Sequence, residues 1–538
     1  MFRYVKNGWA LSSIFLSLVV IIPILTVILF FVIPGDDTWI HLRETVLNTY
    51  IKNSITLVVF VSLGTILIGL STAWVVTMYS FPFKRYIEWV LVLPLAIPSY
   101  ALAYVYSDIL GYGGYITKIL AIIFDSNIKS INFYSIYGGI FVFIFSLYPY
   151  VYLLMRQALM TQSGSYIEIA KISGLNIRQI LYKVSLPISR PALAGGVTLV
   201  IMETLADYGV SDYLGIDTFT KGIYRAWFNL GDIASAGKLS AILLITVGIV
   251  IALERKLRGN AKYNNEVRSS RGFKLIKLNK FYTSVAIIIC IIPIILGFIL
   301  PFITLILWSL KSIDNIYSYS FIYLVFSSFS LAFSSALICI IFALIIVYGM
   351  RTNAKLVTPF ARIASLGYSI PGAVAAIGIL IPLVWLDNVI NKISINLFNS
   401  STGLILTGTW FALLFAYLVR FLALSMQSVE NSFIKISKSI DQAAKVLGAS
   451  NRVILNNIHM KIGLGGVSLG ILIVFVDVLK ELPATMILRP FGLSTLAIKA
   501  HELAVDERLN DAALPLLAII IVCLIPLYLL NKVIRHEQ

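Results

Sequence analysis

Long runs of apolar residues recur along this sequence, and they constrain its fold more than any other feature. Each run is near the roughly 20 residues that an α-helix needs to cross the hydrocarbon core of a bilayer. A scan finds about twelve of them, with ends placed to within a few residues. They lie at about 9–33, 55–78, 87–106, 137–154, 191–205, 239–253, 282–307, 321–347, 363–386, 402–422, 462–479 and 513–530. The sequence therefore predicts an all-α integral membrane protein in a lipid bilayer.

Composition agrees with this class and excludes an ordinary soluble globular protein. The chain is 59% hydrophobic and 12% charged, whereas soluble domains are about 45–50% apolar and about 25% charged. Its formal charge of +17 fits membrane proteins, which keep an excess of Lys and Arg on their cytoplasmic side. We therefore expect no nucleic-acid partner.

The cysteines and the one phosphate-loop-like segment do not predict a cofactor site. Cys290, Cys339 and Cys523 all lie inside apolar runs without metal-ligand spacing, and such cysteines behave as small apolar residues. The segment 231–238 resembles a phosphate-binding loop, but it is one residue too long, and Leu239 stands where Ser or Thr must bind magnesium. We expect no cofactor, nucleotide or catalytic site in this chain.

Basic residues set the predicted orientation. Arg3 and Lys6 precede the first apolar run, which is too long for a cleaved signal peptide and reaches Pro34 without a cleavage site. The largest basic cluster, nine residues between 255 and 280, follows an even number of spans and so lies on the side of the N-terminus. The positive-inside rule places that side in the cytoplasm. We predict a multi-pass protein of the bacterial inner membrane with both termini in the cytoplasm.

The two halves of the sequence repeat each other. Gly174 and Gly448 lie in similar segments, and the distance along the chain from the first to the second is called the repeat offset below. An Ile-Pro pair ending at Pro98 recurs at Pro371, at almost the same offset. Each proline removes a helix hydrogen bond, so we expect a kink there. The predicted domains are a first repeat, 1–262, and a second repeat, 263–538. With six spans each, the repeats insert in parallel, which is typical of transporters with a pathway at the repeat interface.

Two cytoplasmic loops, at about 157–190 and 425–461, encode the same small structure. Each opens with a Ser followed three residues later by Glu or Gln, which predicts a capping box at a helix start. Each then has a Gly suited to a left-handed helix end and a polar residue that can cap a second helix. These residues are Ser165, Glu168, Gly174 and Asn176 in the first loop and Ser439, Gln442, Gly448 and Ser450 in the second. Since a bilayer does not require such helices at its surface, the pattern predicts a protein partner.

The loops resemble the Glu-Ala-Ala loop of binding-protein-dependent ABC importer permeases, whose short helix docks into a groove on the ATPase subunit. The matching residues are Glu168, Ala170, Gly174, Leu186 and Pro187 in the first loop and Gln442, Ala443, Ala444 and Gly448 in the second. Ile169 and Gln442 depart from the motif, and Met460-Lys461 stands where Leu-Pro is usual. The resemblance implies that the second loop contacts the ATPase less strongly.

The resemblance covers nearly the whole chain and is nearest to the two-half permeases of ferric-iron importers, which have a type I importer fold. The stretches that carry it are 202–209, 218–228 and 477–490. It implies a permease without a nucleotide site, a cytoplasmic ABC ATPase dimer that hydrolyses ATP, and a periplasmic binding protein that delivers ferric iron. The alternatives are a thiamine, phosphonate or polyamine permease of the same superfamily, or a secondary transporter driven by an ion gradient.

Four acids at the predicted outer ends of spans are candidates for the pathway or its gate. Glu203 and Asp207 are four residues apart, and Asp477 and Glu481 repeat this spacing one repeat offset later. Acids at the edge of the hydrocarbon usually face protein or water. They could pair locally, for instance with Lys480, and lock an outer gate, or contact a cation directly through hard oxygen ligands. Simple exposure at the interface is the third possibility.

Overall fold

The computed structural model describes residues 8–111, 114–124, 132–162, 164–258, 275–314 and 318–536. Among these, eleven helices are long and apolar enough to cross a membrane, or up to twelve if one bent pair counts as a span. The bent pair joins Lys84–Ala96 to Ser99–Lys118 at an angle of 91°. The prediction of an all-α membrane protein with about twelve spans is therefore confirmed.

The two prolines of the Ile-Pro pairs begin helices and do not bend continuous ones. Pro98 is the N-cap of α5 (Ser99–Leu110), and Pro371 is the N-cap of α18 (Gly372–Phe398). A short 3-10 turn precedes each of them, η1 (Leu93–Ala96) and η6 (Ser365–Ser369). The predicted kinks are thus helix breaks, because the residue before a proline avoids the helical region.

The described residues form two compact units by their internal contacts. Unit 1 comprises Met1–Glu44, Gly222–Leu244 and Ser312–Leu503, and unit 2 comprises Thr45–Lys221, Ile245–Lys311 and Ala504–Gln538. Each unit takes segments from both predicted repeats. The units are therefore not the repeats themselves, and the repeat boundary near residue 262 stays a prediction about the sequence.

Unit 1 is built around three packed helices, α16 (Tyr319–Thr352), α19 (Trp410–Ile434) and α22 (Met460–Lys480). α1 (Gly8–Leu29) packs on α16, on α17 (Ala354–Ala364) and on α18, all from the second half of the sequence. The Ser13 hydroxyl donates to the Ile345 carbonyl at 2.9 Å. Gly349 and Gly378 face α1 so closely that a Cβ there would overlap it, which is how small residues bring membrane helices together.

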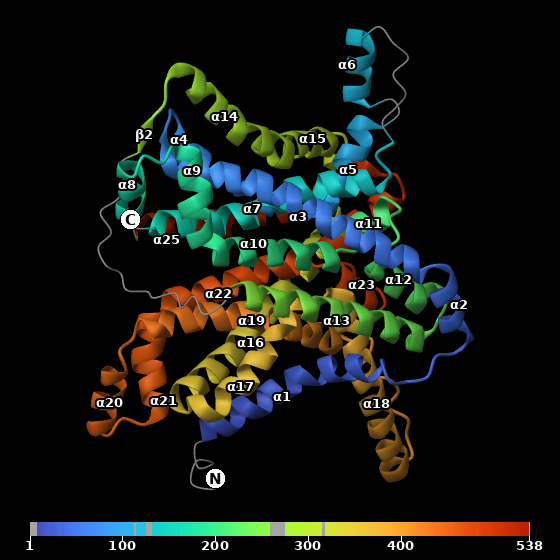
Figure 1. The fold of residues 1–538 in the computed structure, drawn as a ribbon. Helices are drawn as coiled ribbons and strands as arrows, with labels where there is room; N and C mark the ends of the chain where they lie inside the picture. Colours follow the sequence, from blue (N-terminus) through green and yellow to red (C-terminus); the bar gives the residue numbers. More distant parts are fainter. Residues whose placement is uncertain are drawn as a thin grey trace. The chain divides into compact units, whose positions relative to one another are not determined.

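Unit 2 is built around α3 (Leu47–Met78), α7 (Ile136–Thr161) and α10 (Leu186–Ala206), which run side by side in Figure 1. α14 (Lys280–Ile294) contacts α3, and α15 (Leu300–Ser309) packs on α25 (Leu509–His536). A short parallel pair, β1 (Tyr79–Ser80) with β2 (Ile276–Lys277), joins the ends of two of these segments.

The surface of the long helices has the polarity expected in lipid. On α1 the exposed side chains are all large and apolar, and most recur every three or four residues: Leu11, Phe15, Leu18, Ile22, Leu25, Ile28 and Leu29. The opposite face buries Ser13 and Ser17, and the Ser17 hydroxyl donates to the carbonyl four residues earlier at 2.8 Å. This arrangement reverses that of a soluble helix and leaves the hydroxyl satisfied inside the protein.

One three-part helix occurs twice at a constant separation. In unit 2, α9 (Ile177–Ile180) continues through a π-helical turn, η2 (Leu181–Ser185), into α10. In unit 1, α21 (Asn451–Ile454) continues through η7 (Leu455–His459) into α22. Every boundary in the first set matches its counterpart in the second at the repeat offset found in the sequence. The fifth and eleventh predicted spans are therefore longer than expected, at 177–206 and 451–480.

Candidate functional site

The first loop forms the predicted helix, turn and second helix. α8 (Gly164–Ile172) ends at Gly174, whose φ is +79°. The Gly174 N–H donates to the Lys171 carbonyl at 3.0 Å, and the Leu175 N–H donates to the Ala170 carbonyl at 3.1 Å. This pair of bonds is a Schellman motif, which needs a left-handed residue at its centre. The predicted role of Gly174 is confirmed.

A capping box then starts the second helix of the first loop. The Asn176 side chain accepts from the Gln179 N–H at 3.0 Å, and the Gln179 side chain accepts from the Asn176 N–H at 3.0 Å. Two of the free N–H groups at the start of α9 are thereby satisfied. Asn176 is the predicted cap, and the structure confirms it.

The second loop repeats this geometry. α20 (Lys438–Val446) ends at Gly448, whose φ is +83°. The Gly448 N–H donates to the Lys445 carbonyl at 3.0 Å, and the Ala449 N–H donates to the Ala444 carbonyl at 2.9 Å. The Ser450 hydroxyl then accepts from the Val453 N–H at 3.4 Å. The left-handed glycine and the second cap are both confirmed.

The predicted caps at the start of both loops are wrong. α20 begins one residue after Ser437, and the Ser437 hydroxyl accepts from the Ser439 N–H at 3.2 Å. Ser437 and Ser439 could both cap this helix. Because Ser437 comes two residues earlier, the helix that it caps is longer, and Ser439 lies inside its first turn. In the first loop, α8 begins at Gly164, so Ser165 also lies inside the helix.

Both short helices bury a small residue and expose large apolar ones. Ala170 and Ala444 are buried, whereas Glu168, Gln442 and Ala443 are exposed. Ile172 and Val446, which the repeat offset relates to each other, are each 87% exposed. A buried alanine lets each helix lie close to its own unit. The exposed apolar tips beyond it are the kind of surface that a protein partner covers.

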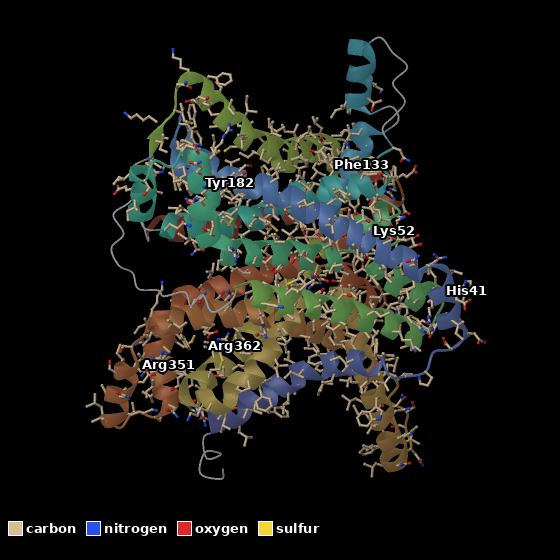
Figure 2. The ribbon with its side chains drawn as sticks, viewed as in Figure 1. His41, Lys52, Phe133, Tyr182, Arg351 and Arg362 are labelled. Carbon is tan, nitrogen blue, oxygen red and sulfur yellow. The ribbon has the colours of Figure 1, made fainter. Side chains whose placement is uncertain are left out.

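A charged brace that the sequence did not predict ties α20 to the spans of unit 1. The Arg351 guanidinium, at the end of α16, donates to Asp441 on α20 at 2.6 Å and to the Phe433 and Ile436 carbonyls at 2.7 and 2.8 Å. The other Asp441 oxygen lies 2.8 Å from His459 Nε2. Figure 2 labels Arg351 beside this loop. The brace therefore fixes the second loop through three charged or polar side chains.

An uncharged amide holds the corresponding place in the first loop. The Gln162 side chain donates to the Ser185 carbonyl at 3.0 Å and to the Ser189 hydroxyl at 2.6 Å. Ser185 is the counterpart of His459, because each is the last residue of the equivalent π-helical turn. The two loops are thus similar in backbone and different in the chemistry of their attachment.

We expect Asp441→Asn to loosen α20. Burial raises the pKa of Asp441. The hydrogen bonds from Arg351 and His459 together lower it by more than burial raises it, so the pKa lies below its ordinary value. A carboxyl group with a depressed pKa contributes stability above its ordinary pKa of about 3.9, and the contribution is lost as the pH falls through the depressed value. The brace should therefore hold at neutral pH. Hydrogen bonds to charged groups contribute about 1.5–3 kcal/mol, so amide exchange in 438–446 should accelerate about tenfold or more at pH 7.

A matched change on the same helix, Lys438→Gln, should leave this exchange unchanged because Lys438 is exposed. Equal exchange in Asp441→Asn and in the unmodified protein would contradict the role of the brace. Between pH 8 and pH 5, the protection of these amides relative to their intrinsic exchange rate at each pH should stay unchanged in the unmodified protein.

Glu481, one of the four predicted acids, forms a buried ion pair in unit 1. It is 5% exposed, and Arg420 Nη1 on α19 donates to its Oε1 at 2.6 Å. The same oxygen accepts from the Ala484 N–H at 3.0 Å, at the start of α23 (Pro483–Leu488). A Cβ at Gly372 would overlap both charged groups, so a larger first residue of α18 would displace the ion pair. Arg420 was not predicted as the partner of Glu481.

Two of the other three acids, Asp477 and Asp207, make local side-chain contacts. Asp477 pairs with Lys480 at 3.3 Å, as the local-pairing interpretation suggested for this lysine. Asp207 ends α10, and its side chain accepts from the Val210 N–H at 2.8 Å at the start of α11 (Gly209–Tyr213). Glu203 lies half-buried one turn earlier, and its carbonyl accepts from the Asp207 N–H. All three therefore lie where spans end.

The four acids fall into two units, so their convergence on one pathway stays a prediction. Glu203 and Asp207 belong to unit 2, and Asp477 and Glu481 belong to unit 1. Within the part of the chain that the structure describes, no three side chains of His, Cys, Asp or Glu are grouped so that they could hold a metal ion.

Several known proteins are similar in sequence to this chain or to parts of it. A family model described as binding-protein-dependent transport system inner membrane component matches residues 65–258, which include the whole first loop. The Fe(3+)-transport system permease protein FbpB 2 of Haemophilus influenzae is 24% identical, over 90% of this chain and 89% of that protein.

Two further relatives match smaller parts of the chain. The probable sulfate transport system permease protein cysT of Prototheca wickerhamii is 26% identical, over 34% of this chain and 72% of that protein. The putative 2-aminoethylphosphonate transport system permease protein PhnU of Salmonella choleraesuis is 23% identical, over 37% of this chain and 70% of that protein.

Proposed function

Because this chain belongs to the inner membrane components of binding-protein-dependent transport systems, we propose that it is the permease subunit of an ATP-driven importer of ferric iron. As a membrane component of a transport system it is not itself an enzyme. In this proposal a separate cytoplasmic ABC ATPase dimer hydrolyses ATP, and a periplasmic binding protein delivers the substrate.

The observation that carries the coupling role is the pair of matching surface helices. α8 and α20 end in the same Schellman motif and expose an apolar tip, Ile172 or Val446, at equivalent positions. An ATPase dimer offers two equivalent surfaces, so a permease with two such helices fits it. Glu168, Ala170 and Gly174 in the first loop, and Gln442, Ala443, Ala444 and Gly448 in the second, are the proposed coupling residues. The brace through Arg351 would transmit movement of α20 to α16.

The proposed gate uses the acids at the ends of the spans. Glu481 at the end of α22 pairs with Arg420 in the middle of α19, and both lie against the start of α18 at Gly372. Glu203, Asp207 and Asp477 are proposed as further members of the same outer gate. The ion pair can be broken only in a conformation that supplies new partners or water, since an unpaired buried charge is costly. It therefore favours the resting state over the open one.

Ferric iron is the proposed substrate because a relative that matches nearly the whole chain is named as an Fe(3+)-transport permease. The sulfate and 2-aminoethylphosphonate permeases match less than half of the chain. The test is uptake into proteoliposomes that contain this chain, its ATPase and its binding protein. Uptake of labelled ferric iron is expected, with no uptake of sulfate, 2-aminoethylphosphonate, thiamine or polyamine. Iron uptake that continues without the ATPase would support an ion-gradient-driven transporter.

We expect Ile172→Asp and Val446→Asp to weaken retention of the ATPase on the purified permease. Both side chains are almost fully exposed in the free chain, so the folded permease should tolerate the change, whereas a covered carboxylate would lose its hydration. An apolar anchor at the centre of an interface is worth about 2 kcal/mol or more, so each change should reduce retention about tenfold or more. Lys438→Gln is the exposed control on α20. Full retention by both Asp variants would contradict the docking role.

A further inference from the structure

An ion pair ties a short helix to a long one in each unit. In unit 2, Glu88 on α4 (Lys84–Val90) accepts from Arg156 on α7 at 2.9 Å, and Lys84 lies 3.8 Å from the same carboxylate. In unit 1, Arg362 on α17 donates to both oxygens of Glu430 on α19, at 2.7 and 3.1 Å. Figure 2 labels Arg362. Each pair thus joins the helix before a Pro-containing break to a central helix of its unit.

The two pairs occupy the same place with opposite charge. The repeat offset carries Glu88 onto Arg362, and it carries Arg156 onto Glu430. It is the same separation that relates α9, η2 and α10 to α21, η7 and α22. The short helix therefore carries the acid in one unit and the base in the other, and the long helix carries the opposite group.

Local stability alone gives no reason for this inversion. A partly exposed ion pair contributes about 0–1 kcal/mol in either direction of charge. Which helix carries the acid and which carries the base matters only if a helix of one unit can pair wrongly with a helix of the other unit. Exchanged pairing would place Glu88 beside Glu430 and Arg362 beside Arg156, which brings like charges together in both places. Like charges in contact discriminate more strongly against a wrong partner than an exposed pair favours the right one.

Each half of the sequence contributes a helix to the unit that is built mainly from the other half. A helix could therefore pack in the wrong unit while the chain folds. α1 from the first half packs on α16, α17 and α18 of unit 1, and α14 from the second half contacts α3 of unit 2. Similar helices in the two halves must therefore be sorted while the chain folds. We propose that the inverted pairs Glu88–Arg156 and Arg362–Glu430 select the correct helix pairing and exclude exchange of α4 with α17. This inference does not depend on the substrate.

The test separates this selection from local pairing by exchanging charges. E88R/R156E keeps an attractive pair in unit 2 but gives both units the same polarity, so exchanged pairing becomes attractive. Its yield of monodisperse protein in detergent is expected to fall about fivefold, the factor that corresponds to about 1 kcal/mol. The quadruple variant, which adds R362E/E430R, inverts both pairs and should restore the yield. E88Q/R156Q, which only removes the pair, should have a small effect.

The matched control exchanges the charges of an ion pair that has no counterpart of opposite charge in the other unit. D217K/K221D acts on a pair four residues apart on one segment, with a separation of 3.7 Å, and should keep the normal yield. A normal yield of E88R/R156E would overturn the proposal. A quadruple variant that fails to recover would also overturn it, because the loss would then come from the local surroundings of residues 88 and 156.

Discussion

Gly174→Val and Gly448→Val are expected to abolish import while the protein remains folded and inserted. Both glycines have φ near +80°, and a Cβ at either would meet no other atom, so the cost is purely conformational. A left-handed residue with a side chain costs about 1–2 kcal/mol, and a β-branched one is worse. The turn can relax only by breaking its Schellman bonds, which moves the tip of the preceding helix. Import should fall by more than about tenfold.

Two other changes test the conformational explanation. Gly448→Asn should retain much more import than Gly448→Val, because Asn tolerates the left-handed region. Gly465→Val also adds a side chain in open space, but on the regular part of α22, and should transport normally. The assay is iron flux together with ATP hydrolysis stimulated by the binding protein. Normal stimulated hydrolysis in both glycine-to-valine variants would remove the coupling role of the turns.

Arg420→Ala should be the most destabilising single change in unit 1 among the charged residues discussed. It leaves Glu481 buried without its guanidinium partner, and breaking a buried pair in this way costs about 3–5 kcal/mol. Replacement of both groups together, Arg420→Met with Glu481→Leu, should recover most of the stability because no charge is then left unpaired. Thermal denaturation of the purified permease measures the two effects. Equal stability of Arg420→Ala and the unmodified protein would contradict the buried ion pair.

Glu481→Gln separates the two interpretations of the outer acids. If the ion pair locks the gate, its loss should raise basal ATP hydrolysis, since such a coupling is typically worth about 1–3 kcal/mol. If Glu481 instead contacts the cation, basal hydrolysis stays normal and iron flux slows. Asp477→Asn is the control, because its more exposed pair with Lys480 contributes about 0–1 kcal/mol. Unchanged hydrolysis and flux after neutralisation of all four acids would remove both interpretations.

Features that depend on neighbouring residues were predictable from the sequence. The spans followed from apolar run length, because lipid leaves a helix no other way to satisfy its backbone. Gly174, Gly448 and Asn176 followed from turn and cap chemistry that acts between close neighbours in the chain. The same local logic failed at Ser439, where Ser437 provides an equally good cap two residues earlier.

Features that depend on distant residues were not predictable from one sequence. Arg351 and Asp441 are 90 residues apart, and Arg420 and Glu481 are 61 apart. Arg420 lies within the predicted apolar run 402–422, and a charge in such a run indicates a partner inside the protein without identifying it. The division into units was also hidden, since the sequence repeat suggests that each half folds on its own segments.

The position of α1 has a consequence for synthesis of the chain. α1 leaves the ribosome long before the helices that it packs on, because α16 to α18 begin only at Tyr319. Until they are inserted, the face of α1 with Ser13 and Ser17 lacks the helices that bury it in the folded protein. Such late, long-range contacts slow folding and expose intermediates to quality control. A nascent chain that stops before residue 398 therefore contains α1 without all of the helices that it packs on. Membrane proteases could recognise the exposed face of α1 in such an incomplete chain.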